Sequence, residues 1–469
     1  MEARNWVERL LIQRAGDPEI GCNTLGDELE RVPYAALPEQ VQLIGDRLVA
    51  GGMGEREHVA LECENSLPTL LTLLTLLAQG RSVVLLPRGV QAPTPPFCRV
   101  RVLAQASSGP GADVSVATNS SWCGAEAVES RLYVRTSGTT GAAKLAVHTL
   151  QALEQNARNC VERFALGPED RVVMPVAQAH MFGLGAGLLP ALLAGASIEL
   201  QAKANVLTYF ARERAFEPTV AYLTPAFCQA LLRARRGQHS YRLTVTAGDR
   251  IAEDVFREYE RVHGSLVCLY GSTELGAIAA SSPTLSLDAR AVSVGHAMTG
   301  VTLRVLGEEG EVGELAVEHP CGFSGYANAQ GEPERPSGGS AHRTADLGRR
   351  LADGRLQVLG RLDHRVKRDG KMVAYSDVEA ALESLPALHR VVAFADHSAV
   401  PGPRGSLLVA CYSAEQALDS KVLRRASLNV LERHAMPDRF VHIAEWPTLP
   451  SGKIDRQALV EQHQRLQDH

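Results

Sequence analysis

The sequence predicts an α/β protein with a large N-terminal domain of layered β-α sheets plus a small distorted β-barrel, followed by a small α+β domain. Between residues 130 and 280, strand-like apolar runs alternate with helix-like runs, which favours parallel β-α layers. From 290 to 360 the glycines multiply and the apolar runs shorten, a pattern typical of a small antiparallel sheet or a distorted barrel. After residue 360 the pattern changes to a compact α+β unit of about 100 residues.

The alternating region defines the core of the predicted fold. Its apolar runs predict strands over 171–176, 197–200, 219–223, 243–246 and 266–270. The runs between them predict helices over 149–164, 184–195, 205–214, 225–234 and 252–263. The same pattern is present in a weaker form over 38–100.

The later regions complete the predicted domain plan. Shorter apolar runs predict strands over 302–306, 314–317 and 356–359, and 331–340 is typical of a polar loop. The final region predicts helices over 375–385 and 419–434 and strands over 390–396 and 406–412. We therefore expect an N-terminal core over 1–360, a connection over 361–364 and a C-terminal domain over 365–469.

Composition excludes several classes of function. The chain has 469 residues, a net charge of −5 and no basic block, so neither nucleic acid nor an acidic membrane surface is an expected partner. Its longest apolar stretch, 67–78, is shorter than the roughly 20 residues of a membrane span. The N-terminus lacks the apolar core of a signal peptide, and nine cysteines are scattered without a C-x-x-C pair. These features predict a cytoplasmic protein with reduced thiols.

The most informative stretch runs from Arg135 to Lys144 and reads R-T-S-G-T-T-G-A-A-K. Glycines allow backbone N–H groups to point at an anion, the hydroxyls add donors, and the lysine adds a charge. This combination suits a polyphosphate. The spacing differs from G-x-x-x-x-G-K-[ST], so an ordinary P-loop NTPase is disfavoured.

A second cluster, 269–274, follows a predicted strand and reads L-Y-G-S-T-E. It is expected at the carboxyl edge of the parallel sheet, where α/β proteins bind ligands. Glu274 offers a hard oxygen for Mg²⁺ carried by phosphates, and Tyr270 could stack on a base. Taken alone, the cluster is better explained as a strand followed by a capped turn.

Three more clusters lie downstream. Asp346, within 342–350, can accept two hydrogen bonds from a ribose diol. The segment 360–371 is dense in charge, and Lys453 follows a glycine in a C-terminal loop. Taken one at a time, the first is better explained as a surface charge cluster, the second as a solvated linker, and Lys453 as an exposed lysine.

The order, spacing and joint presence of these clusters resemble the adenylate-forming superfamily. That superfamily contains acyl- and aryl-CoA synthetases, carrier-protein-loading adenylation domains and luciferase-like enzymes. The resemblance runs from about Arg131 to Ala458, and more loosely from residue 38. It implies ATP and Mg²⁺ as cofactors. It also implies that the C-terminal domain is mobile and rotates about Asp363 between two half-reactions.

The resemblance implies roles for the residues of the first two clusters. The β- and γ-phosphates of ATP would be held by Thr136, Ser137, Gly138, Thr139, Thr140, Gly141 and Lys144. In the second cluster, Tyr270 would lie beside adenine, followed by Gly271. Thr273 would lie beside the α-phosphate and the reacting carboxylate, and Glu274 would bind Mg²⁺.

The resemblance also implies roles for the downstream residues. Asp346 would bind both ribose hydroxyls, and Arg361 would support it. Gly370 would line the tunnel for the thiol in the second half-reaction. Lys453 would bridge the substrate carboxylate and the phosphate during adenylation, where it offsets the repulsion between two anions.

The acid pocket is expected around residues 178–184, with His180 and Gly183 in its lining and Gly248 near adenine and substrate. Relatives that activate α-amino acids have an aspartate in this stretch to hold the ammonium. Because this chain has His180, a free α-amino acid is disfavoured. A structural histidine that caps the following helix is the alternative.

Ala345 replaces a usual glycine before Asp346, and one methyl group is tolerable there if φ is negative.

The predicted function is therefore an ATP-dependent acid–thiol ligase that forms an acyl adenylate. We expect an aromatic or otherwise short acid as substrate, since small residues are frequent around the pocket. The acceptor is a phosphopantetheinyl carrier protein, slightly preferred, or free CoA; Lys367, Arg368 and Lys371 could face either. A luciferase-like or adenylate-releasing enzyme and a non-catalytic nucleotide-binding module remain as alternatives.

Overall fold

The computed structural model describes residues 5–88, 92–107, 111–136, 144–202, 205–234, 239–308, 310–335, 341–362, 364–369, 371–396, 406–448 and 454–465. The chain divides into two compact units: Met1–Thr302 with Val317–His342, and Leu303–Ala316 with Arg343–His469. We call these the larger and the smaller unit. The domain boundary predicted at 361–364 stays a prediction.

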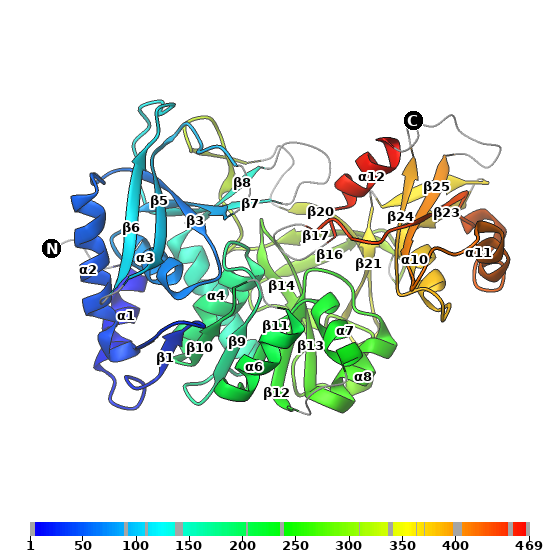
Figure 1. Ribbon diagram of the computed structural model, residues 1–469, viewed down its shortest axis with the longest axis horizontal. Helices are drawn as coiled ribbons and strands as arrows, with labels where there is room; N and C mark the ends of the chain where they lie inside the picture. Colours follow the sequence, from blue (N-terminus) through cyan, green and yellow to red (C-terminus); the bar gives the residue numbers. More distant parts are fainter. Residues whose placement is uncertain are drawn as a thin grey trace. The chain divides into compact units, whose positions relative to one another are not determined.

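The larger unit contains a nine-stranded sheet. In spatial order its strands are β15 (His296–Ala297), β14 (Gly276–Ala280), β13 (Gly264–Ser272), β12 (Tyr241–Ala247), β11 (Val220–Leu223), β9 (Arg171–Met174), β10 (Ser197–Leu200), β1 (Thr24–Gly26) and β2 (Arg31–Pro33). The central strands β10, β9, β11, β12 and β13 are parallel. Helices α6 (Val206–Phe216), α7 (Pro225–Ala234) and α8 (Glu253–His263) lie beside β11 to β13 (Figure 1). The predicted β-α alternation over 130–280 is therefore confirmed.

A second sheet in the larger unit has eight strands. In spatial order they are β19 (Pro333–Glu334), β18 (Gly325–Ala327), β8 (Leu145–Thr149), β7 (Arg131–Arg135), β4 (Ser82–Pro87), β3 (His58–Cys63), β5 (Cys98–Ala106) and β6 (Ala112–Thr118). Strand β3 pairs in parallel with β4 and β5, so the weaker pattern over 38–100 is also a β-α layer. Residues 333–334, predicted as part of a polar loop, extend the β18 edge because they pair with Tyr326 and Ala327.

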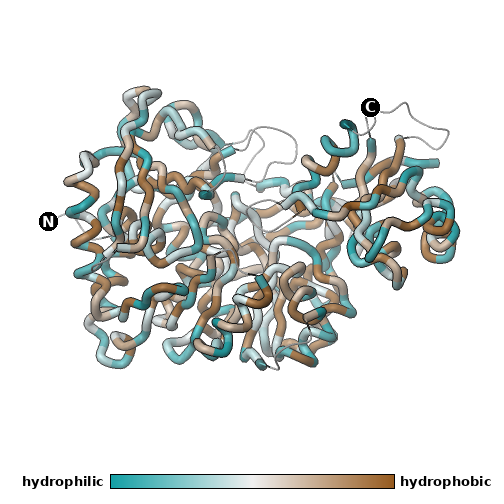
Figure 2. The backbone as a smooth tube through the Cα atoms, viewed as in Figure 1, coloured by the Kyte–Doolittle hydropathy of each residue, from teal (hydrophilic) through white to brown (hydrophobic). Residues whose placement is uncertain are grey.

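The remaining helices of the larger unit follow from local sequence. They are α1 (Trp6–Gly16), α2 (Leu37–Ala50), α3 (Leu67–Ala78), α4 (Leu150–Phe164), α5 (Leu189–Ala194), α9 (Leu287–Ala291), the 3₁₀ turn η1 (Tyr34–Ala36) and the π-helix η2 (Phe182–Leu188). Every residue of α3 is buried, so its leucines serve the core. Thr149 caps α4 by accepting a hydrogen bond from the Ala152 N–H. Hydrophobic residues concentrate along the strands, and hydrophilic ones in outer helices and turns (Figure 2).

The smaller unit begins with an open four-stranded sheet. Its order is β16 (Thr302–Leu306), β17 (Gly313–Glu318), β20 (His342–Arg350) and β21 (Leu356–Arg361). Strands β20 and β21 are antiparallel, as expected for this region, and the described strands show no closure into a barrel. Among the described residues there is also no helix whose length and hydropathy would let it span a bilayer.

The rest of the smaller unit has the expected α+β character. Its elements are β22 (Arg365–Arg368), β23 (Lys371–Ala374), α10 (Tyr375–Glu383), β24 (Arg390–Asp396), β25 (Leu407–Ser413), α11 (Ser420–Ser427), the 3₁₀ turn η3 (Arg433–Ala435), β26 (Arg439–His442) and α12 (Arg456–Arg465). The helix predicted over 419–434 was too long. It ends at Ser427, whose hydroxyl donates to the Leu423 carbonyl, and Asn429 follows in a tighter i→i+3 turn.

Candidate functional site

The carboxyl ends of the parallel strands bring several predicted residues together in the larger unit. Strands β12 and β13 pair from Thr244↔Leu266 to Ala247↔Leu269, so Gly248, which directly follows β12, lies at the level of Tyr270 in β13. Gly248 has a φ of 95°, a conformation that favours glycine. Thr273 and Glu274 then form the turn between β13 and β14, which we call the adenylation turn (Ser272–Gly276).

Two glycines shape the adenylation turn. A Cβ on Gly271 would lie 2.3 Å from the Gly276 carbonyl oxygen, so only glycine lets β13 and β14 approach this closely. Gly276 has a φ of 67°, and a Cβ there would lie 2.6 Å from Oδ1 of Asn156. The sequence Y-G-S-T-E-L-G therefore specifies a tight hairpin whose loop carries Thr273 and Glu274, both half-buried.

Neighbouring segments hold the adenylation turn by its carbonyl groups. His148 on β8 donates from Nε2 to the Thr273 carbonyl at 2.8 Å, and the Phe323 N–H donates to the Glu274 carbonyl at 2.7 Å. His319 donates to the Ala277 carbonyl at 3.0 Å, while its Nδ1 accepts from the Cys321 N–H at 3.1 Å. These contacts preorganise the turn from the second sheet and from the segment that leads into β18.

Burial keeps both of these histidines neutral. Desolvation lowers the pKa of His148 to about 4, although the Thr273 carbonyl and Glu274 act in the opposite direction. Desolvation also lowers the pKa of His319. A neutral imidazole donates one hydrogen bond without adding a charge next to Glu274. The two histidines therefore position the turn without competing with a cation for its carboxylate.

Tyr326 links Glu274 to the predicted phosphate loop. Its hydroxyl donates to Glu274 Oε1 at 2.9 Å, and Nζ of Lys144 lies 4.8 Å from the centroid of its ring. Burial raises the pKa of the Tyr326 hydroxyl, so it stays a donor. Tyr326 thus separates the ammonium of Lys144 from the carboxylate of Glu274 and contacts both.

The base of the phosphate loop is closed by the backbone. The Thr136 N–H donates to the Lys144 carbonyl at 2.8 Å, and the Lys144 N–H contacts Thr136 Oγ1 at 3.3 Å. Residues 137–143 between them, including Ser137, Gly138, Thr139, Thr140 and Gly141, lie outside the described residues. Both ends of the predicted loop therefore lie at the β7–β8 hairpin, which also carries His148.

The donor set around Glu274 suits a magnesium ion that arrives with a nucleotide. Mg²⁺ in nucleotide sites is bound by one or two carboxylates together with phosphate oxygens. Glu274 supplies one carboxylate next to the phosphate-loop hairpin. Across the described residues there is no cluster of three or more His, Cys, Asp or Glu side chains able to hold a metal ion. Glu274 would hold the ion, which would supply charge neutralisation to the phosphates.

The predicted acid pocket begins at the π-helix η2. The His180 carbonyl accepts the Leu184 N–H at 2.8 Å, and its side chain is half-buried. A Cβ on Gly183 would lie 2.2 Å from the Ala177 carbonyl oxygen, and one on Gly187 would lie 2.7 Å from Cε of Met174. These glycines allow close backbone packing. The expectation of an aromatic or short acid and the pocket roles of His180, Gly183 and Gly248 stay predictions.

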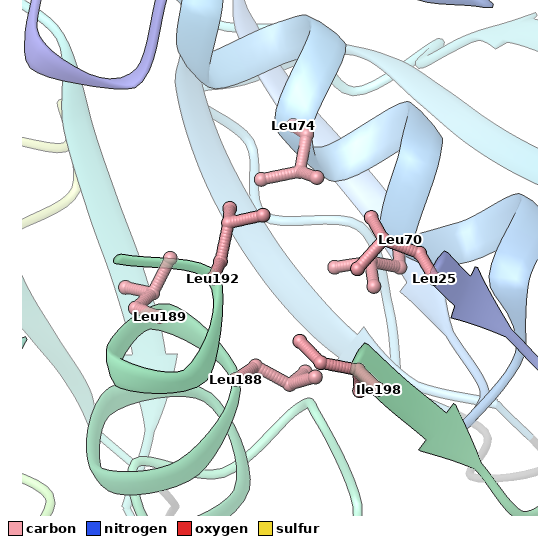
Figure 3. Close-up of a pocket in the computed structure, with 7 residues that line it drawn as sticks. All are labelled: Leu25, Leu70, Leu74, Leu188, Leu189, Leu192 and Ile198. Atoms are coloured by element: carbon pink, nitrogen blue, oxygen red, sulfur yellow. The ribbon is translucent and has the colours of Figure 1, made fainter. Parts of the chain in front are cut away.

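A leucine-lined gap lies behind η2. Its walls are Leu25, Leu70, Leu74, Leu188, Leu189, Leu192 and Ile198 (Figure 3). All seven side chains are aliphatic and buried, so the gap offers no group that could orient a carboxylate. It is a space within the core between α3, α5 and β10.

In the smaller unit, the structure brings Asp346 and Arg361 together. They are paired residues in the β20–β21 ladder, and Arg361 Nη1 lies 3.5 Å from Asp346 Oδ1. Ala345 has a φ of 58°, so the condition under which its methyl group was expected to be tolerable is not met. An L-residue in this region is strained by about 1 kcal/mol relative to glycine.

Two expectations about the smaller unit are corrected or left open. Arg368 is buried and donates to both oxygens of Asp438, at 2.9 and 2.7 Å. A buried guanidinium needs such a carboxylate partner. Arg368 therefore cannot face CoA or a carrier protein. Lys371 lies 3.5 Å from Glu432. Asp363, Gly370 and Lys453 lie outside the described residues, so the hinge, the thiol tunnel and the shuttling lysine stay predictions.

Comparisons with known proteins address the same residues. The model of the AMP-binding enzyme family matches residues 132–327, which contain the phosphate-loop hairpin, η2 and the adenylation turn. The chain belongs to the adenylate-forming superfamily. The expected superfamily is therefore confirmed, and the chain is an AMP-binding enzyme of the class that includes acid–thiol ligases.

Individual relatives cover the chain to different extents. An indoleacetate–CoA ligase of Aromatoleum aromaticum is 27% identical over 97% of this chain and 96% of its own length. A sulfoacetate–CoA ligase of Cupriavidus necator is 29% identical over 70% of this chain and 66% of its own. A dimodular nonribosomal peptide synthase of Bacillus subtilis is 27% identical over 70% of this chain, which spans 14% of that protein.

Solved structures confirm the fold. ATP-bound MatB from Rhodopseudomonas palustris superposes with a TM-score of 0.80 at 19% identity, covering 99% of this chain and 100% of its own. The anthranilate CoA ligase AuaEII in complex with anthranoyl-AMP gives the same TM-score and identity over 98% of both chains.

Proposed function

We propose that the protein is an ATP-dependent ligase that activates a carboxylic acid as an acyl adenylate and transfers it to a thiol. The carrying observation is the Lys144–Tyr326–Glu274 arrangement beside the β7–β8 hairpin. This arrangement supports a site in which Lys144 would contact the phosphates and Glu274, just after the carboxyl end of β13, would bind their metal ion. The family-model match over 132–327 supports the same assignment.

The proposed chemistry has two steps. In the first, a carboxylate oxygen of the acid attacks the α-phosphorus of ATP, and pyrophosphate leaves. Thr273 would contact the α-phosphate, and Lys453 would neutralise the meeting anions. In the second, a thiol sulfur attacks the acyl carbon, the bond to AMP breaks, and the thiol proton is lost to solvent.

Free CoA is the acceptor that the comparisons favour. The relative that matches nearly the whole chain is named as a CoA ligase, whereas the peptide synthase is matched over a small part of its length. This proposal replaces the slight preference for a carrier protein that we inferred from the sequence. A carrier protein remains the second candidate.

The substrate is proposed to be an aromatic or short carboxylic acid. The names of the two CoA-ligase relatives include one acid of each kind, indoleacetate and sulfoacetate. His180 at the start of η2 argues against a free α-amino acid, whose ammonium would need a carboxylate partner.

A pyrophosphate-exchange screen tests this proposal. ATP, Mg²⁺ and labelled pyrophosphate are incubated with indoleacetate, sulfoacetate, anthranilate, benzoate or phenylalanine. We expect exchange with at least one of the first four and none with phenylalanine. Mass detection of acyl-CoA after addition of CoA then distinguishes the ligase from an adenylate-releasing enzyme. Absence of exchange with every acid would contradict the proposal and favour a non-catalytic nucleotide-binding module.

The predicted division of labour can be tested at Lys453. We expect Lys453→Ala to abolish pyrophosphate exchange and to spare thioester formation from supplied acyl adenylate. The reason is that the lysine offsets anion repulsion only in the first step. Equal loss of both steps would refute this role.

A further inference from the structure

Asn156 joins the predicted acid pocket to the adenylation turn. It lies on α4 and is buried, with 2% of its surface exposed. Its Nδ2 donates to the Gly185 carbonyl in η2 at 2.6 Å, and its Oδ1 accepts from the Ala277 N–H, next to the turn, at 2.9 Å. One amide group therefore bridges two segments that are far apart in the sequence.

The π-helix makes the Gly185 carbonyl dependent on this bridge. In η2 the Leu189 N–H bonds to the Leu184 carbonyl, which is an i→i+5 register. In that register the Gly185 carbonyl would accept a hydrogen bond from the N–H of residue 190. Residue 190 is proline, which has no N–H. The Asn156 amide supplies the missing donor at a buried position, where an unpaired carbonyl is costly.

The surroundings leave little freedom for the two segments to move apart. A Cβ on Gly276 would lie 2.6 Å from Asn156 Oδ1, so the turn approaches the amide closely. The Met181 methyl group lies close to both segments. A Cβ on Gly185 would lie 2.6 Å from its Cε, and a Cβ on Gly276 would lie 3.6 Å from it. Asn156 and Met181 therefore lie close to both η2 and the turn.

We propose that Asn156 is a positioning residue that couples the acid-binding helix η2 to the adenylation turn. This inference rests on the proposed function, because it takes η2 as the wall of the acid pocket. Asn156 touches neither ATP nor acid in this scheme. It fixes the position of Thr273 and Glu274 relative to the bound carboxylate, so that filling either subsite orders the other.

Hydrogen–deuterium exchange tests the coupling without turnover. The probe is α,β-methylene-ATP with Mg²⁺ added to the full-length protein. In the wild type we expect slower exchange in peptides that cover both 272–277 and 182–188. In Asn156→Ala we expect protection of 272–277 to persist and protection of 182–188 to be lost. Protection confined to 272–277 in the wild type, or protection of both segments in Asn156→Ala, would overturn the inference.

Asn159 offers a matched control on the same helix. It is also buried, and its Nδ2 donates to the Thr299 carbonyl at 2.9 Å, away from the turn. Asn159→Ala should lower the melting temperature about as much as Asn156→Ala while keeping both segments protected. If Asn156→Ala does not fold, Asn156→Asp at pH 8 keeps the acceptor for Ala277 and removes the donor for Gly185; it should release 182–188 alone.

Kinetics separate this inference from the proposed function. With the acid that gives the fastest pyrophosphate exchange among the five tested, Asn156→Ala should reduce kcat/KM for the acid about tenfold, the effect of one lost buried hydrogen bond. The KM for ATP should stay within about twofold. A wild-type enzyme without exchange contradicts the function, whereas an active wild type with an unchanged Asn156→Ala variant contradicts the coupling alone.

Discussion

The adenylation turn and the segment around Asp346 are both irregular backbone, but the chain supports them differently. At the turn, the residue with positive φ is Gly276, and carbonyl groups on both sides of Glu274 accept hydrogen bonds from His148, Phe323 and His319. Beside Asp346, the residue with positive φ is Ala345. The turn therefore adopts its positive φ without strain and is held by hydrogen bonds, whereas the Asp346 segment retains strain that a single substitution could release.

Removing the charge of Glu274 gives the largest expected effect on the turn. Glu274→Gln keeps an oxygen that accepts from Tyr326, so the fold is preserved, but it removes the carboxylate proposed to bind Mg²⁺. We expect pyrophosphate exchange to fall about 10²–10³-fold, comparable to the loss of one preorganised electrostatic group. Initial rates at varied Mg²⁺, with the melting temperature as the control, measure this. Unchanged rates would show that Glu274 does not bind Mg²⁺ during adenylation.

The support from His148 predicts a pH dependence of stability. Burial lowers its pKa from 6.5 to about 4, so below pH 6.5 the unfolded chain binds a proton that the folded chain excludes. The free energy of unfolding should fall as the pH drops from 6.5 to 4, by up to about 3 kcal/mol from this residue. Denaturant unfolding of the wild type and of His148→Gln, which can still donate, should show a flatter dependence in the variant. If the free energy of unfolding changes equally with pH in both proteins, His148 is not the cause of the pH dependence.

The hydroxyl of Tyr326 gives the next effect. Tyr326→Phe keeps the ring under Lys144 and removes the hydrogen bond to Glu274. We expect about a tenfold lower kcat/KM for MgATP, since a hydrogen bond to a charged group contributes about 1.5 kcal/mol or more. Tyr133→Phe is the control, because its hydroxyl donates to Gly331 rather than to the turn. An equal loss in both variants would indicate a general packing effect.

Releasing the strain at Ala345 gives the smallest effect, and it acts in the opposite direction. Ala345→Gly should stabilise the protein by about 1 kcal/mol, because glycine adopts a φ of 58° without strain. Ala165→Gly, at a φ of 47° after α4, should give a similar gain far from Asp346. Thermal and denaturant melts measure both variants. Destabilisation by Ala345→Gly alone would show that its methyl group contributes packing that outweighs the strain.

The sequence predicted the parts of the molecule whose signals are local or periodic. The β-α alternation over 130–280 was found because buried parallel strands appear as short apolar runs. The strands 302–306 and 390–396 were found with the same bounds from their own short apolar runs. The clusters 135–144 and 269–274 were found because their glycines and hydroxyls lie close together in the chain.

The residues that support the site escaped prediction for a physical reason. Tyr326 and His148 act on Glu274 and Thr273 from 52 and 125 residues away, and Asn156 acts on Ala277 from 121 residues away. None of them has a distinctive neighbour in the sequence. The π-helix was equally hidden, although a proline five residues after Gly185 is a signal that could have indicated it.

Direct detection of the intermediate is the most direct test of the account. The wild-type enzyme and Glu274→Gln are mixed in excess with ATP, Mg²⁺ and each acid of the panel, without a thiol, and quenched for mass spectrometry. We predict an acyl-AMP adduct with at least one aromatic or short acid in the wild type, and strongly reduced formation in the variant. ATP that remains intact with every acid, or equal adduct in both proteins, would contradict the assignment of the adenylation turn.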